Sequence, residues 1–174
     1  MKTSLTWWNE VLANSNLLTE WLQKQYHGEV TASERITVFR DTFCFDPRHH
    51  KTLTIIAEQE KMHASWVGEL LISRGITPQV LKKQERYWEA TLPGIEDFAT
   101  GSAVASHAEN MRLDRINVIA KHPKTPPDIR AVFLKILPQE VFHEKAFAQM
   151  AGKEAIDKTS HQHHVGMTAL GLTA

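Results

Sequence analysis

Four long stretches of the chain carry apolar residues three and four positions apart, and each of these apolar stripes also contains a glutamate. This spacing is that of one face of an α-helix. Alternating runs are few and Asn-Gly or Asp-Gly hairpin turns are absent, so we predict an all-α fold. Because an uncompensated buried carboxylate is costly, the acids in the stripes must meet something that neutralises them.

The predicted helices cover residues 16–43, 47–74, 95–121 and 127–151. Gly75 ends the second helix, and Pro126-Pro127 precedes the fourth. The connection over residues 75–94 is too long for a tight turn, and we expect a short helix from Pro78 to Glu89 within it, with Trp88 packed on the bundle. Short, long and short connections between four helices are typical of a ferritin-like four-helix bundle, with the long crossover between the second and third helices.

The domain organisation follows from these helices. A chain of 174 residues can bury one core of ordinary size. We predict an N-terminal helical extension over residues 1–15, which contains Trp7 and Trp8, a ferritin-like di-metal bundle over 16–156, and a flexible C-terminal tail over 157–174.

Composition excludes several classes of function. The chain has 20 basic and 20 acidic residues, so it lacks the positive charge that nucleic-acid binding requires. The single cysteine, Cys44, rules out an internal disulfide and any multi-cysteine metal site within one chain. No uncharged apolar run approaches the ~20 residues of a transmembrane helix. Because the N-terminus also lacks a secretion signal, we expect a cytoplasmic protein.

Two copies of the motif Glu-x-x-His mark the predicted second and fourth helices. They are Glu60-Lys-Met-His63 and Glu140-Val-Phe-His143, and on a helix a three-residue offset puts both side chains on one face. The other two stripes each supply one glutamate. This pattern is that of di-iron and di-manganese bundles. The predicted metal ligands are Glu29, Glu60, His63, Glu109, Glu140 and His143.

The donor set indicates which metal would bind. Two divalent cations balance the charge of four carboxylates, and oxygen donors with a minority of imidazoles suit iron or manganese. The absence of thiolates argues against structural zinc, although zinc could occupy the site adventitiously. We therefore expect two iron ions, with manganese as the alternative.

The ligand segments resemble those of known di-iron proteins. Gly28-Glu29, followed by Arg35-Ile-Thr-Val-Phe39, is similar to the first ligand helix of rubrerythrins, and residues 57–64 are similar to the second helix of rubrerythrins and demethoxyubiquinone hydroxylases. Residues 108–110 and 140–144 resemble the third and fourth rubrerythrin ligand segments. The resemblance covers about residues 16–151. It departs in two respects, because rubredoxin-type cysteine pairs are absent and Arg112 stands where a further glutamate would be.

The resemblance implies membership of the ferritin-like di-iron carboxylate superfamily. It implies an oxidoreductase that uses O2 or peroxide on an unknown small-molecule substrate. The electrons would come from an external electron donor. A homodimer is one expected oligomer. Ferroxidase activity or iron storage is an alternative that uses the same ligands. A metal-free helical interaction module is the second alternative, in which the paired motifs are coincidental.

Several other residues have competing interpretations. Glu34 is the alternative ligand in the first helix. Four residues lie beside the ligands in sequence but off the stripes, and we expect surface or supporting roles for them: Glu58, His107, Asp114 and Glu144. Arg112 is placed to brace a carboxylate, and Pro138 should kink the fourth helix. Tyr26 is expected to pack, and His161, His163 and His164 are expected to bind metal only incidentally.

Overall fold

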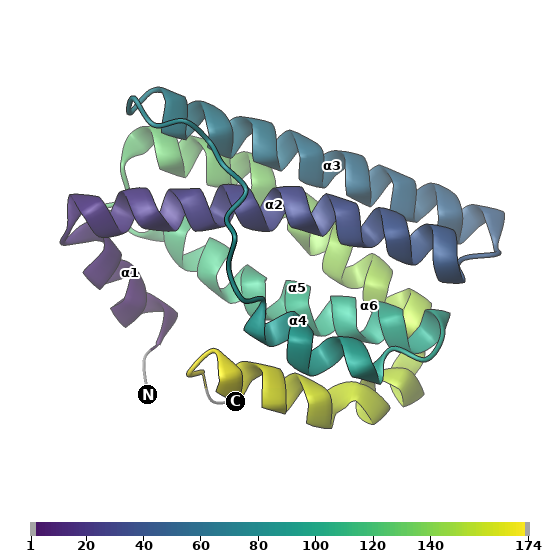
Figure 1. Ribbon diagram of the computed structural model, residues 1–174. Helices are drawn as coiled ribbons and strands as arrows, with labels where there is room; N and C mark the ends of the chain where they lie inside the picture. Colours follow the sequence, from purple (N-terminus) through teal and green to yellow (C-terminus); the bar gives the residue numbers. More distant parts are fainter. Residues whose placement is uncertain (1–2, 173–174) are drawn as a thin grey trace. The chain divides into compact units, whose positions relative to one another are not determined.

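The computed structural model describes residues 3–172, and every regular element in that range is a helix (Figure 1). The elements are α1 (Ser4–Leu12), α2 (Ser15–Phe43), α3 (Pro47–Ile72), α4 (Arg86–Thr91), the short 3-10 helix η1 (Leu92–Gly94), α5 (Phe98–Lys121) and α6 (Pro127–Ala169). The all-α prediction is confirmed. None of the helices within residues 3–172 combines the length and apolarity needed to cross a membrane.

Side-chain caps set where the long helices begin. The Asn14 side chain accepts a hydrogen bond from the backbone N–H of Asn16 at 2.9 Å, and Asp46 accepts one from Arg48 at 2.8 Å. Before α5, the Thr100 N–H donates to Asp97 Oδ1 at 2.8 Å, while Thr100 Oγ1 accepts from the Asp97 N–H at 3.0 Å. These reciprocal bonds satisfy amides that the first helical turn leaves without backbone partners.

The connection after α3 is less helical than we predicted. The expected helix from Pro78 to Glu89 is wrong over most of its length, because helical structure begins only at Arg86. The backbone before it is bound by side chains of α2: Gln23 Nε2 donates to the Gln79 carbonyl at 2.8 Å, and the Leu81 N–H donates to His27 Nδ1 at 3.1 Å. Backbone groups held in this way are not available for the hydrogen-bond ladder of a helix.

The chain divides into two compact units, and α5 and α6 contribute residues to both. We call residues 3–82 and 115–139 the α2/α3 unit, and residues 83–114 and 140–172 the α4 unit. In the α2/α3 unit, α2 and α3 pack together along much of their length (Figure 1). Its core joins aliphatic side chains to Trp8, Trp21 and Phe133. Trp8 of α1 is fully buried, and its indole N–H donates a hydrogen bond to Thr125 Oγ1 at 2.8 Å. The one polar group of this buried side chain is therefore satisfied.

Within the segment predicted as a flexible C-terminal tail, residues 157–174, the chain is helical as far as Ala169. Gly152 has a φ of 72°, a conformation that glycine adopts without steric cost, and it redirects the chain between two helical segments of α6. The second segment packs within the α4 unit, where Thr159 is 1 % exposed. Residues 1, 2, 173 and 174 of the two predicted terminal segments lie outside the described range.

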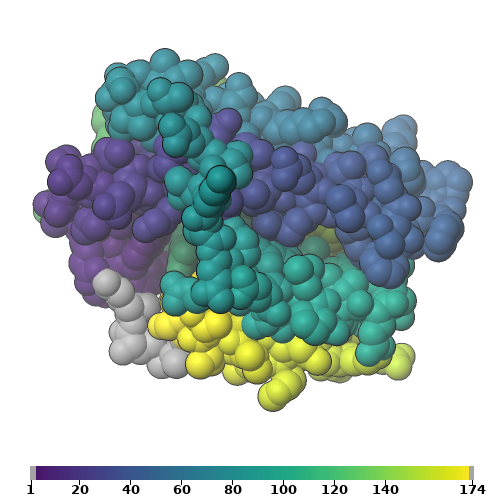
Figure 2. Space-filling model, viewed as in Figure 1, coloured from purple at the N-terminus to yellow at the C-terminus, as the bar shows by residue number. Residues whose placement is uncertain are grey.

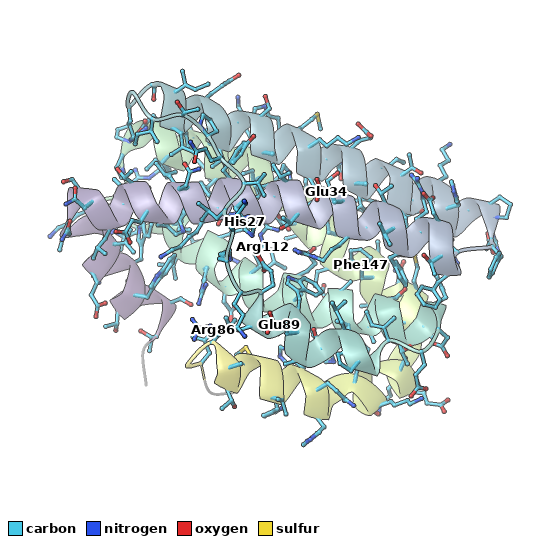
Figure 3. All side chains as sticks on the ribbon, in the orientation of Figure 1. His27, Glu34, Arg86, Glu89, Arg112 and Phe147 are labelled. Atoms are coloured by element: carbon cyan, nitrogen blue, oxygen red, sulfur yellow. The ribbon has the colours of Figure 1, made fainter. Side chains whose placement is uncertain are left out.

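The α4 unit has a core of small side chains, Ala103, Ala151 and Ala155, with Phe147 fully buried in α6 (Figure 3). The C-terminal segment of α6 and the region of α4 lie side by side in this unit, as the yellow and teal surfaces of Figure 2 show. At their contact, a Cβ built on Gly166 would come within 2.7 Å of the Tyr87 ring. The close approach therefore requires glycine at position 166.

Candidate metal centre

Three of the predicted ligands come together in the α2/α3 unit. Glu29 comes from α2, and Glu60 and His63 lie one turn apart on α3; all three are fully buried. Each offers one ligand atom to a group whose members lie within 4.8 Å of one another. His63 Nδ1 lies 3.6 Å from Oε2 of Glu29 and 3.6 Å from Oε2 of Glu60. We call these three residues the first triad, and a divalent cation could be held among them.

The orientation of the His63 ring is set by a residue that we did not predict. His63 Nε2 lies 2.9 Å from Oε1 of Gln139, which belongs to the same unit. An amide oxygen can only accept, so Nε2 carries the proton and donates it. In the neutral ring Nδ1 then has its lone pair directed at the two carboxylates, which is the tautomer that binds a metal.

A second amide supports Glu29. Gln25 lies one turn earlier on α2, and its Nε2 donates to Glu29 Oε1 at 2.5 Å. The bond occupies Oε1, while Oε2 is the atom that faces His63. Gln25 could have been found from its spacing, because residues four apart share a helix face. Gln139 could not, because 76 residues separate it from His63.

The other three predicted ligands come together in the α4 unit. Glu109 lies on α5 and is 6 % exposed, while Glu140 and His143 lie one turn apart on α6 and are fully buried. Their ligand atoms also belong to a group whose members lie within 4.8 Å of one another, and His143 Nδ1 is 3.6 Å from Glu140 Oε2. We call these residues the second triad. It repeats the composition of the first: two carboxylates and one imidazole.

Arg112 approaches the second triad, as the sequence suggested. Its Nη2 lies 3.4 Å from Glu140 Oε1, and its side chain is 20 % exposed (Figure 3 labels its place on α5). The guanidinium thus supplies one positive charge beside a buried carboxylate. A divalent cation in the triad would add two further positive charges beside its two carboxylates.

The donor chemistry of both triads fits a hard divalent metal. Each triad offers carboxylate oxygens and one imidazole nitrogen and contains no thiolate, a set that suits iron or manganese. Bringing two carboxylates and a histidine close together out of water would otherwise be costly. The residues present therefore fit the metal ions that the sequence implied.

The alternative candidates lie outside the triads. Glu34 is exposed on α2 (Figure 3), and Glu58 is exposed and paired with Lys61 at 2.7 Å. Asp114 is also exposed, and Glu144 is half-buried. None of these residues belongs to either group of potential metal ligands found within residues 3–172.

His107 lies in a different cluster, which we did not predict. Its ring stacks on that of His163, with centroids 4.6 Å apart and planes 9° apart, and His163 Nδ1 lies 2.8 Å from the Tyr87 hydroxyl. The tract at residues 161–164 had suggested only incidental metal binding. Within that tract His163 and Gln162 are half-buried, whereas His161 and His164 are exposed.

In comparisons with known proteins, no family model, curated protein or solved structure matches this chain. What the chain offers for inferring function is therefore its geometry, namely two buried triads of like composition, one in each compact unit.

Proposed function

We propose that the two triads together hold a pair of iron ions in a ferritin-like four-helix bundle, and that the protein is an oxidoreductase that uses O2 or peroxide. The observation that carries this proposal is the repetition of the same buried donor set in both units. A single triad would explain one structural cation. Two copies of Glu-x-x-His, each joined by one further glutamate, match the requirement of a dinuclear carboxylate centre.

The charges support two ions rather than one. The six residues bring four carboxylates and two neutral imidazoles, so two divalent cations leave the centre neutral. Arg112 contributes a further positive charge beside Glu140, which favours binding of an anion or of a reduced oxygen species near the second triad. Iron, when bound, supplies the electrons for reducing O2 or peroxide.

The residues around the triads have defined roles in this proposal. Gln139 keeps the His63 proton on Nε2 and so leaves Nδ1 as the ligand atom. Gln25 fixes one oxygen of Glu29 and leaves the other for the metal. Burial of all six side chains keeps bulk water from competing for the ligand positions. An external donor would return the electrons after each turnover, and the organic substrate belongs to no class that these residues specify.

Metal binding and oxygen reactivity test the proposal directly. Protein purified without chelators is loaded anaerobically with Fe(II), and the bound metal is counted after equilibrium dialysis. We expect two equivalents per chain, followed on addition of O2 by a change in near-ultraviolet absorption. Glu60→Ala and Glu140→Ala should each reduce the number of iron ions bound per chain. Glu58→Ala, at an exposed position of α3, should not.

Other outcomes would reject the proposal. Binding of two equivalents without any optical response to O2 or peroxide would argue against an oxidoreductase. A large assembly in gel filtration that accumulates many irons per chain would favour the storage function instead. Failure to bind iron or manganese would reject the metal centre and favour the alternative of a metal-free helical interaction module.

A further inference from the structure

Tyr87 is a buried phenol that faces a histidine. It lies in α4, is 5 % exposed, and its hydroxyl oxygen is 2.8 Å from His163 Nδ1. With the imidazole proton on Nε2, the phenolic O–H donates to Nδ1. Gly166 allows the Tyr87 ring to pack in this position, because any larger residue at 166 would clash with the Tyr87 Cδ2 and Cε2 atoms. The pair is thus set by packing and does not depend on a mobile side chain.

The His163 ring is held on its other side as well. It stacks almost parallel to His107, and His107 Nε2 lies 3.2 Å from the carbonyl oxygen of Ile156. Because a carbonyl only accepts, His107 donates from Nε2 and its ring plane is fixed. The His163 ring therefore contacts the His107 ring on one side and the Tyr87 hydroxyl through its Nδ1.

The protonation states of the pair suit proton transfer. Burial raises the pKa of Tyr87, and the negative charge of Glu109 raises it further, so the phenol keeps its proton. Burial, and then the nearby imidazoles of His107 and His164, lower the pKa of His163 to about 4, so this ring is a neutral acceptor at pH 7. The influence of Glu109 also puts Tyr87 within electrostatic reach of the second triad.

We propose that Tyr87 is a one-electron donor and that His163 takes up its proton when the electron leaves. The O–H bond of Tyr87 breaks, an N–H bond forms at His163 Nδ1, and one electron passes to an oxidant, which leaves a neutral tyrosyl radical hydrogen-bonded to an imidazolium. With iron bound, the oxidant would be the iron centre in the presence of O2 or peroxide, so this physiological role rests on the proposed function. The return of the proton and an electron from the external donor restores Tyr87.

The chain contains a natural control. It has two tyrosines, and Tyr26 lies in the α2/α3 unit, where its ring packs against Gly68. Tyr26→Phe removes the same hydroxyl group as Tyr87→Phe but leaves the Tyr87–His163 pair intact. His163→Gln provides a second comparison, because an amide oxygen can accept the phenolic hydrogen bond but cannot hold the proton.

The first experiment uses the metal-free full chain, carrying ring-deuterated tyrosine. The protein is photo-oxidised with a ruthenium sensitiser and an irreversible electron acceptor, frozen, and examined by electron paramagnetic resonance. We expect a tyrosyl signal, narrowed by ring deuteration, in the unmutated protein and in Tyr26→Phe. In Tyr87→Phe it should fall by at least about tenfold. In His163→Gln the radical lifetime should shorten by about tenfold, roughly the factor expected for losing one hydrogen bond to a charged group.

If His163 had only a structural role, its substitution would not change the hydrogen bond of the tyrosyl radical. In D2O, the unmutated protein should show an exchangeable deuteron coupled to the radical, and His163→Gln should lose this coupling while keeping its helical circular dichroism. The proposal is overturned if the signal persists in Tyr87→Phe, if it resides on tryptophan, or if His163→Gln leaves both lifetime and coupling unchanged.

The iron-loaded protein separates this inference from the proposed function. Iron that binds and reacts with O2 should yield the Tyr87 radical, which Tyr87→Phe should lack. If iron binds and reacts without producing that radical, Tyr87 is not its donor, although the oxidoreductase proposal stands. If no iron binds, the proposed function fails, and the photo-oxidation result alone decides whether Tyr87 and His163 form a redox pair.

Discussion

Gln139 and His63 are joined by a 2.9 Å hydrogen bond that leaves Nδ1 of the histidine facing Glu29 and Glu60 at 3.6 Å. The contact links the residue just before Glu140, the glutamate of the second Glu-x-x-His motif, to the histidine of the first motif. It makes an amide, and not a carboxylate, the group that orients this candidate ligand. A neutral acceptor fixes the ring without adding a further negative charge to the buried acids.

Gln139→Leu should weaken metal binding without removing a ligand. We expect the affinity for Mn(II) or Fe(II) to fall by about 10- to 100-fold, the usual effect of losing a residue that orients a metal-bound histidine. Isothermal titration gives the affinity. Gln149→Leu makes the same substitution at an exposed position of α6 and serves as the control. Equal affinities for the two variants would show that Gln139 does not orient His63.

Glu60→Gln should change the stability of the metal-free and metal-loaded proteins in opposite directions. The metal-free protein should become more stable by on the order of 1 kcal/mol, because a neutral amide replaces a fully buried acid that lies close to Glu29. The increase in melting temperature that metal produces should be reduced or lost.

Thermal unfolding with and without Mn(II) measures both effects. Glu58→Gln, two residues earlier and exposed, should leave both melting temperatures nearly unchanged. Retention of the full metal-induced increase by Glu60→Gln would mean that Glu60 is not a ligand.

Two glycine substitutions should have opposite effects on stability. At Gly166 a Cβ would lie 2.7 Å from Tyr87 Cδ2 and 3.1 Å from Thr91 Cγ2, so Gly166→Ala should destabilise the protein by about 1–3 kcal/mol. At Gly28 no atom beyond the neighbouring backbone of α2 lies within 4 Å of the added Cβ, so Gly28→Ala in the middle of α2 should stabilise it by about 0.5–1 kcal/mol. Urea denaturation measures both changes. Tolerance of alanine at position 166 would contradict the packing of α6 against α4.

Stability should fall as the pH drops from about 6.5 to about 4, and His163 should account for part of the decline. Its pKa is about 4 in the folded protein against 6.5 for an ordinary histidine. The unfolded chain therefore binds a proton in this range that the folded chain does not, which favours unfolding as the pH decreases.

His163→Gln should flatten this dependence, since glutamine does not titrate. The free energy of unfolding is measured in urea at about pH 7 and about pH 4.5, on either side of the ordinary histidine pKa. His161→Gln changes an exposed histidine on the same helix and provides the comparison. An equal slope in His163→Gln and the unmutated protein would show that burial of this ring does not affect its proton affinity.

The burial of the six candidate ligands could be predicted because helix geometry is local. Residues three, four and seven apart share a face, so glutamates within apolar stripes had to be buried. The structure buries all six and gathers them as two triads. That the triads form one dinuclear centre in a ferritin-like bundle stays a prediction, because spacing within a helix carries no information on how separate parts of the chain meet.

The features that we did not predict share a physical origin in contacts between distant residues. Residues 78–85 have helical character in sequence, yet Gln23 and His27 bind their backbone from α2. The polar run His161-Gln-His-His resembles a solvated tail, but Gly152 redirects the chain and His163 packs on Tyr87 and His107. Neither contact leaves a periodic pattern in the local sequence.

The uneven placement of indole rings gives each compact unit its own optical reporter. Four of the five tryptophans, at positions 7, 8, 21 and 66, belong to the α2/α3 unit, whereas Trp88 alone belongs to the α4 unit, where its ring meets Tyr87 edge-on at 5.4 Å. Emission from Trp88→Phe therefore follows the α2/α3 unit alone, and the difference from the unmutated protein isolates the other unit. Coincident denaturation curves would identify one cooperative folding unit, and separated midpoints would identify two.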